Sequence, residues 1–502
     1  MRAEVPAQAL ASAQPLVSRG AARTLLVGGV AIAILAIFIA PVQDPDFWWH
    51  LRIGEWMLAS RQLPQHDIFT FTASSHTWTD HEYATELLMA LAHRAGGVLL
   101  ISVAFGMITW LGFWLIYKTA RGSRQPYVVV GLALALAAVA GAPIWGPRAQ
   151  MITFLLSCLE LYWLRRYLDG SSRAIRWFPL VMVAWANLHG GWVIGFVFLG
   201  VALAAELVLW AVDPSSAVRR ARVRMLGLVL AGSAVAVLAT PHGLSLYLYP
   251  FQTQGSAAQQ KLIVEWFSPD FHQNFLRPFE AMVFLLFAGF TLRRPSLYEF
   301  LLSIATLALA LQSVRHIALF IAASTPVLIT TWSHVWNGLA ARRPLRLGHA
   351  GGSPMLVGVT VVALVVIAAA TGARTASQLA REVELTRHDY PVQAADWLAG
   401  HPELGRRMYN QYGWGGYLAY RFYPDPDRRV FIFGEAALMG DRLLQQYQDV
   451  QTLRSDWRNV LDEYGVDYVV YNRGEALANV LEGDPGWARV YQDDVAVIFV
   501  RR

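Results

Sequence analysis

Residues 44–50 have the sequence DPDFWWH, and LRIGEWM follows at residues 51–57. This stretch comes directly after the first long apolar run, residues 24–41, so two carboxylates, two tryptophans and a histidine stand where an apolar helix would meet water. Pro41 directly after Ala40 is a poor context for signal-peptide cleavage, and we interpret the run as a retained first span. We expect the rest of the chain to hold DPDFWWH at a membrane surface.

The composition is that of a polytopic membrane protein. Of 502 residues, 55% are hydrophobic and only 15% are charged, whereas soluble domains have about 25% charged residues. We assign the arginines behind the net charge of +6 to membrane topology, and therefore expect no nucleic-acid partner. The single cysteine, Cys158, excludes an intrachain disulfide and a zinc–thiolate site.

About eleven apolar runs predict transmembrane helices. Arginines gather in alternate loops between these runs, as the positive-inside rule requires when the N-terminus is cytoplasmic. The alternation places two long loops, residues 42–95 and 241–278, and the C-terminal segment on the outer side. The expected spans are residues 24–41, 96–117, 127–143, 149–164, 177–188, 192–212, 225–240, 279–292, 297–314, 317–332 and 354–371.

We divide the chain into a cytoplasmic tail (1–23), a membrane domain (24–371), a linker (372–388) and an outer soluble domain (389–502). The soluble domain alternates expected strands with expected helices, which is typical of an α/β fold. In the first outer loop, GEWMLAS and HEYATELLMALAHR have the pattern of short amphipathic helices lying on the membrane. The expected strands are VFIFG at 430–434, DYVVY at 467–471 and VAVIFV at 495–500.

An acid at the outer end of a membrane helix lies at a low-dielectric boundary, where its pKa can rise into the range of a general base. Asp44 and Asp46 are the candidates, although either could instead only terminate the first helix. Such a base would take a proton from an acceptor that attacks the anomeric carbon of a lipid-phosphate sugar. The leaving phosphate needs cations, for which we select Arg148, Arg315 and His316.

Other polar residues of the outer side complete the candidate site, and each has a structural alternative such as a helix end or a headgroup contact. The acids and histidines of the first outer loop could also bind a metal, but a DxD spacing is a weak signal. We expect no cofactor, with Mg²⁺ or Mn²⁺ as the alternative. The candidate substrate-binding residues are His50, Arg52, Glu55, Glu82, Arg148, Asn187, His189, Glu265, Arg315 and His316.

The layout resembles the GT-C superfamily of membrane glycosyltransferases, which use polyprenyl-phosphate sugars and include protein O-mannosyltransferases, aminoarabinose transferases and oligosaccharyltransferases. The motifs DPDFWWHLRIGEW, PRAQ, WANLHGGWVIG, VEWFSP, NQYGWGGYL and VFIFGEA look like those of uncharacterised bacterial membrane proteins grouped with it. The resemblance implies that Asp44, or second Asp46, is the catalytic base or the group that positions the acceptor, and that Glu265 is the nearest candidate for a second acidic site. The oligosaccharyltransferase motif WWDYG is absent, which disfavours peptide-asparagine transfer.

The resemblance implies an inverting glycosyltransferase of the bacterial inner membrane that moves a hexosyl or pentosyl group. The expected partners are a polyprenyl-phosphate-linked donor, a lipid, glycan or protein acceptor, and membrane lipids. The C-terminal domain would lie in the periplasm or outside the cell. Two alternatives stay open: a transporter or lipid flippase, which would need polar residues in mid-membrane, and a non-enzymatic envelope scaffold.

Overall fold

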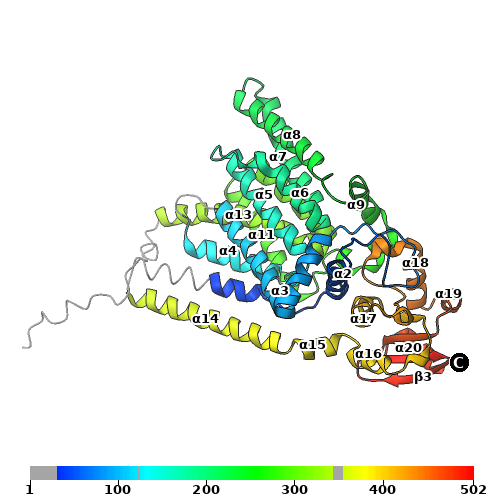
Figure 1. Ribbon diagram of the computed structural model, residues 1–502. Coiled ribbons are helices and arrows are strands. Elements are labelled where there is room, and N and C mark those ends of the chain that lie inside the picture. The colour runs from blue at the N-terminus through cyan, green and yellow to red at the C-terminus, as the bar shows by residue number, and fades with distance from the viewer. Residues whose placement is uncertain (1–30, 121–124, 343–353) are drawn as a thin grey trace, which may run out of the picture.

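A bundle of long apolar helices adjoins a smaller domain that contains a β-sheet and the C-terminus (Figure 1). This computed structural model describes residues 31–120, 125–342 and 354–502. The expected tail, residues 1–23, lies outside the described residues. Of the first expected span only the part from residue 31 onward is described, and residues 31–38 are helical.

The other expected spans all fall on helices, because inside a bilayer a single apolar run satisfies its backbone polar groups within its own segment only as a helix. Within the described residues, four helical segments are long and apolar enough to cross a membrane: Tyr83–Ala120, Gly190–Val212, Asn274–Leu292 and Val314–Ala341. The expected polytopic helical fold with a C-terminal α/β domain is confirmed, and the count of about eleven spans is not. The bundle helices are α3 (Tyr83–Ala120), α4 (Tyr127–Ala140), α5 (Gln150–Leu168), α6 (Phe178–Leu188), α7 (Val193–Val212), α8 (Ala217–Ala236), α11 (Arg277–Leu292), α12 (Leu297–Gln312), α13 (Ile317–Arg342) and α14 (Pro354–Ala380).

The first outer loop is built from two helical segments that pack on each other. DPDFWWH leads directly into α2 (Phe47–Ser60), and α3 is interrupted at Gly96 and Gly97, where Gly97 has a φ of 65° that suits glycine. Gly54 lets α2 approach α3 closely, since a Cβ there would overlap with the Glu86 carbonyl group. The expectation that GEWMLAS lies on the membrane is wrong, because the apolar face of α2 is buried against α3 and the C-terminal domain.

The second outer loop contains the short helices α9 (Ser245–Gly255) and α10 (Ala257–Leu262) and the 3-10 turns η3 (Val264–Trp266) and η4 (Asn274–Leu276). In Figure 1, α9 lies beyond the end of α8 and toward α18. Ser256 donates a hydrogen bond to Asp441 of the C-terminal domain at 2.5 Å. The second outer loop is therefore in contact with both parts of the protein.

The C-terminal domain has a four-stranded sheet in the order β1-β2-β4-β3. β1 pairs with β2 in parallel, and β4 pairs antiparallel with β2 and β3. The expected strand at 430–434 is wrong: within it only Val430 forms an isolated bridge, to Thr70 of the first outer loop. The elements are α16 (Val392–Ala399), β1 (Met408–Asn410), α17 (Gly415–Phe422), α18 (Ala436–Gln451), α19 (Trp457–Glu463), β2 (Tyr468–Asn472), α20 (Ala476–Gly483), β3 (Trp487–Gln492) and β4 (Ala496–Arg501).

The C-terminal domain packs on DPDFWWH through close backbone contacts. The expected linker is helical, formed by the end of α14 and by α15 (Glu382–Asp389). A Cβ at Gly416 would lie 2.8 Å from the Pro45 carbonyl oxygen, and one at Gly434 would overlap with the Asp46 carboxylate. The glycines of NQYGWGGYL and VFIFGEA thus allow this domain to lie directly against the acidic stretch.

Candidate active site

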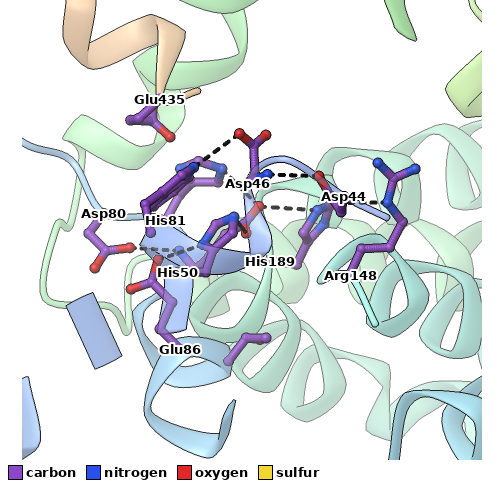
Figure 2. A network of polar contacts seen from close by, with 12 residues as sticks. Asp44, Asp46, His50, Asp80, His81, Glu86, Arg148, His189 and Glu435 are labelled. Atoms are coloured by element: carbon purple, nitrogen blue, oxygen red, sulfur yellow. Dashed lines mark hydrogen bonds and ion pairs between the residues drawn. The ribbon is translucent and has the colours of Figure 1, made fainter. Parts of the chain in front are cut away.

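Asp44, Arg148 and Glu265 come together from three separate segments. The Nε of Arg148 donates to Asp44 Oδ2 at 2.8 Å, and its Nη2 donates to Glu265 Oε1. Figure 2 shows Asp44 and Arg148 facing each other. Burial alone would raise the pKa of Asp44, but the Arg148 charge and the hydrogen bonds to the carboxylate outweigh burial and lower it. Asp44 is therefore a stable anion rather than a ready proton acceptor.

Asp46 has the opposite electrostatic environment although it lies only two residues away. Its backbone N–H donates to Asp44 Oδ1 at 3.0 Å, and Trp49 Nε1 donates to Asp46 Oδ1 at 3.0 Å. Burial, together with the negative charges of Asp44, Glu265 and Glu435, holds the pKa of Asp46 well above its usual value. Two neighbouring carboxyls with pKa values displaced in opposite directions are typical of a pair with divided roles.

Glu82 stands at the centre of three imidazoles. Its Oε1 lies 3.1 Å from His81 Nε2 and 3.2 Å from His189 Nε2, and its Oε2 lies 3.4 Å from His50 Nε2. In Figure 2 the three histidines lie between Asp80 on one side and Arg148 on the other. Burial would raise the pKa of Glu82, but the neighbouring histidines hold it below its usual value.

The tautomer of His189 is fixed by a chain of hydrogen bonds. Its Nδ1 accepts the backbone N–H of Gly191 at 2.9 Å and lies 2.7 Å from the Thr153 hydroxyl. Because Nδ1 accepts from Gly191 and so carries no proton, the Thr153 hydroxyl is the donor to His189, while its oxygen accepts from Trp185 Nε1. Burial lowers the pKa of His189 to about 4, so the ring is neutral and its Nε2 proton is directed at Glu82.

His81 is the charged member of the three. Burial would lower its pKa, but Glu82, Glu435 and Asp80 together raise it to about 9. Its ring lies against that of Tyr249, with a centroid distance of 4.1 Å, and the Tyr249 hydroxyl donates to Glu435 at 3.3 Å. Burial raises the pKa of Glu435 to about 7. The C-terminal domain therefore contributes a titratable carboxyl directly beside the histidine cluster.

Several residues of the cluster were absent from the sequence-based set. Glu86 lies 2.7 Å from His50 Nδ1, and its carboxyl and that of Asp80 interact directly. Asp80, His81, Glu82 and Glu86 share the segment TDHEYATE, where the density of acids and histidines was a usable signal. Glu435 had no such signal, because it is a single charged residue between two apolar segments, VFIFG and AALMG.

Comparison with known proteins rests on structure alone. No family model and no curated protein matches this sequence. ArnT from Cupriavidus metallidurans bound to undecaprenyl phosphate superposes with a TM-score of 0.55 at 15% identity, over 96% of this chain and 98% of that chain. The Archaeoglobus fulgidus oligosaccharyltransferase tethered to an acceptor peptide gives 0.55 at 12% identity, over 96% and 74%. This chain has the GT-C fold. The fold also includes the archaeal enzyme AglB solved with a dolichol-phosphate, at a TM-score of 0.52 and 13% identity, again over 96% and 74%.

On this GT-C fold, Arg315 lies against Trp266, the residue that follows Glu265 in the chain. Its guanidinium stacks 4.6 Å from the centroid of the Trp266 ring, and among the described residues it has no carboxylate partner within ion-pair distance. Its neighbour His316 hydrogen-bonds the Leu309 carbonyl at 3.3 Å, and Ser313 donates to the Glu265 carbonyl at 2.7 Å. The turn that carries Arg315 is thus fixed to the loop that carries Glu265.

Three other predicted residues have their contacts elsewhere. Arg52 donates to the Tyr420 carbonyl and to Glu55, which also contacts His93. Asn187 donates to the Val183 and Ala239 carbonyls and accepts from the Tyr83 hydroxyl. These contacts join structural elements rather than facing the acidic cluster.

Within the described ranges no group of three or more His, Cys, Asp or Glu side chains is disposed to hold a metal ion. The geometry explains this: the Nε2 atoms of His50, His81 and His189 all face Glu82. The Nε2 of His189 carries a proton that it donates to Glu82, whereas a histidine that binds a metal must direct a nitrogen lone pair at the ion.

Proposed function

We propose that this protein is a membrane glycosyltransferase that transfers a sugar from a polyprenyl-phosphate donor to a lipid, glycan or protein acceptor. The observation that carries the proposal is the pair Asp44 and Asp46, with pKa values displaced in opposite directions, beside Arg148 and Arg315 on a GT-C fold. Likeness to ArnT, which was solved with undecaprenyl phosphate, supports a lipid-phosphate ligand. We place the cluster on the outer face of a bacterial inner membrane, following the arginine distribution.

Asp46 is our choice of general base, ahead of Asp44. Asp44 has both carboxylate oxygens engaged and a lowered pKa, whereas Asp46 accepts one side-chain hydrogen bond and has a raised pKa. The raised pKa makes Asp46 the stronger base of the two carboxylates, and this favours Asp46 for the role. Asp44 instead fixes the guanidinium of Arg148.

Arg315 is the cation best suited to the donor phosphate. The charge of Arg148 is offset by Asp44 and Glu265, while Arg315 has only the Trp266 ring as a partner among the described residues. A phosphate would gain charge-assisted hydrogen bonds from Arg315 without breaking an existing ion pair. His316 contributes the adjoining turn.

The proposed reaction is a single displacement. The acceptor oxygen or nitrogen attacks the anomeric carbon as its proton passes to Asp46, and the bond from that carbon to the phosphate oxygen breaks. The lipid phosphate leaves with its electron pair and is stabilised by Arg315 and Arg148. A single displacement of this kind inverts the configuration of the anomeric carbon. The acceptor would lie next to the histidine cluster, which is formed by Glu82, His50 and His189 together with Glu435 of the C-terminal domain.

The test compares Asp46→Asn, Asp44→Asn and the exposed control Asp270→Asn, in proteoliposomes supplied with labelled polyprenyl-phosphate pentose or hexose and an envelope extract. Loss of a general base should lower kcat about 100-fold or more in Asp46→Asn. Asp44→Asn should lower activity through a higher KM for the donor, and Asp270→Asn should match the wild type. Full activity of Asp46→Asn would reject the assigned base. Lipid translocation without sugar transfer by the wild type would replace the proposal with a flippase.

A further inference from the structure

The short helix α9 has one face with no protein partner. Leu244, Leu248 and Phe251 follow one another at intervals of four and three residues, so they lie on one side of the helix. Their side chains are 73%, 60% and 76% exposed. The sequence has no Asp, Glu, Lys or Arg between His242 and Lys261. An exposed apolar face without charged residues is unlike a surface helix that faces water.

The side of α9 that contains Leu246 and Tyr249 contacts the rest of the protein. Leu246 is buried, and the hydroxyl of Tyr247 donates to the Ala234 carbonyl of α8. Tyr249 lies against the His81 ring and hydrogen-bonds Glu435. The exposed face is thus turned away from the candidate active site and from α8.

The apolar face also continues an exposed apolar surface of the bundle. On α8, which packs against the candidate span at Gly190–Val212, the side chains of Leu228 and Val235 are exposed seven residues apart on one face. The chain passes directly from this helix to α9 (Figure 1). The lipid-facing side of the bundle and the exposed face of α9 are therefore joined through consecutive elements.

We propose that α9 lies in the bilayer interface, with Leu244, Leu248 and Phe251 inserted among the lipids of the leaflet on the side of the C-terminal domain. The partner is a lipid surface, and the anchor is apolar, since the helix has no cation to attract anionic headgroups. Insertion of this face holds Tyr249, on the opposite side of the helix, against His81 and Glu435. This placement does not depend on the sugar-transfer chemistry.

The test uses the full-length protein in nanodiscs of phosphatidylethanolamine and phosphatidylglycerol, with nitroxide labels at Leu248→Cys or Phe251→Cys. The matched control is Gln252→Cys, next to Phe251 but on the polar flank of α9 and also exposed. Native Cys158 is buried and is replaced by alanine throughout. Accessibility to dissolved oxygen, which partitions into lipid, is compared with accessibility to a water-soluble nickel chelate.

Insertion predicts that labels at 248 and 251 are several-fold more accessible to oxygen and several-fold less accessible to nickel than the label at 252. Equal nickel accessibility at all three positions would place the face in water and overturn the proposal. Immobile labels at 248 and 251, protected from both reagents, would mean that protein covers the face. Dipolar coupling between labels would identify that protein as a second copy, and this result also overturns the proposal.

Discussion

Replacement of Glu82 by glutamine tests whether one carboxylate organises the histidine cluster. The Glu82 side chain lies within ion-pair distance of His50, His81 and His189. Glutamine keeps the size and one oxygen acceptor but removes the negative charge. We expect the protein to remain folded but to lose stability, because the buried His81 cation then lacks its principal counter-charge.

The magnitude follows from the pKa of His81, which rises from 6.5 to about 9 in the fold. At about 1.36 kcal/mol for each pKa unit, this rise corresponds to about 3 kcal/mol. Glu435 and Asp80 contribute to it, so removal of Glu82 alone should cost about 2 kcal/mol. A cationic group with a raised pKa stabilises the fold fully below pH 6.5, and this contribution is lost as the pH rises through about 9.

The assay is thermal unfolding in nanodiscs at pH 6.5 and at pH 9.5. Glu82→Gln should unfold at a clearly lower temperature than the wild type at pH 6.5, and the gap should narrow at pH 9.5. The control is Glu463→Gln, which removes an exposed ion pair with Arg442 and should change little. If Glu82→Gln and Glu463→Gln behave alike at pH 6.5, Glu82 does not organise the cluster.

Three further variants probe the site and the bundle. Gly434→Ala should reduce the transfer activity of the folded protein about tenfold or more, because the added Cβ would displace the Asp46 carboxylate. The control Gly483→Ala, where the added Cβ meets no other atom, should keep wild-type activity. Equal activity of the two variants would contradict the contact between Gly434 and Asp46. Thr153→Val should lower the free energy of unfolding by about 1–3 kcal/mol, because the Trp185 N–H loses its acceptor. The control Thr153→Ser keeps the hydroxyl and should be close to wild type. An unchanged melting temperature in Thr153→Val would count against the hydrogen-bond chain. Glu160 is buried, and among the described residues neither of its carboxyl oxygens has a hydrogen-bond partner. Glu160→Met should therefore raise the unfolding temperature, because it removes a buried polar group that lacks a partner. A lower unfolding temperature would show that this carboxyl stabilises the fold.

The sequence predicted features that depend on local pattern. Long apolar runs became helices, DYVVY and VAVIFV became β2 and β4, and Arg148 and Glu265 were selected along with Asp44. VFIFG failed as a strand because its backbone groups bond the first outer loop and the Asn410 side chain rather than a neighbouring strand. Strand β3 has only one buried residue of six, so its segment gave no burial pattern to recognise.

The placement of α2 failed for a related reason. Trp48 and Trp49 resemble residues of a membrane interface, yet both are buried, and Trp48 packs against Tyr417 and Tyr420 of α17. An amphipathic pattern specifies that a face is apolar and not what covers it. Among the described outer-loop helices, exposed leucines lie on the first part of α3, at Leu88 and Leu91, and on α9 in the other outer loop.

By itself the sequence determined the membrane class, the helical bundle, the separate C-terminal domain and the set of polar residues expected on one side, because hydrophobicity and charge act on each segment where it stands. Only the tertiary structure decided which of them meet. Arg148 joins Asp44 and Glu265 across 104 and 117 residues, and Glu435 reaches His81 from another domain. The different environments of Asp44 and Asp46 arise from these long-range contacts, since burial and neighbouring charge, not residue type, set a pKa.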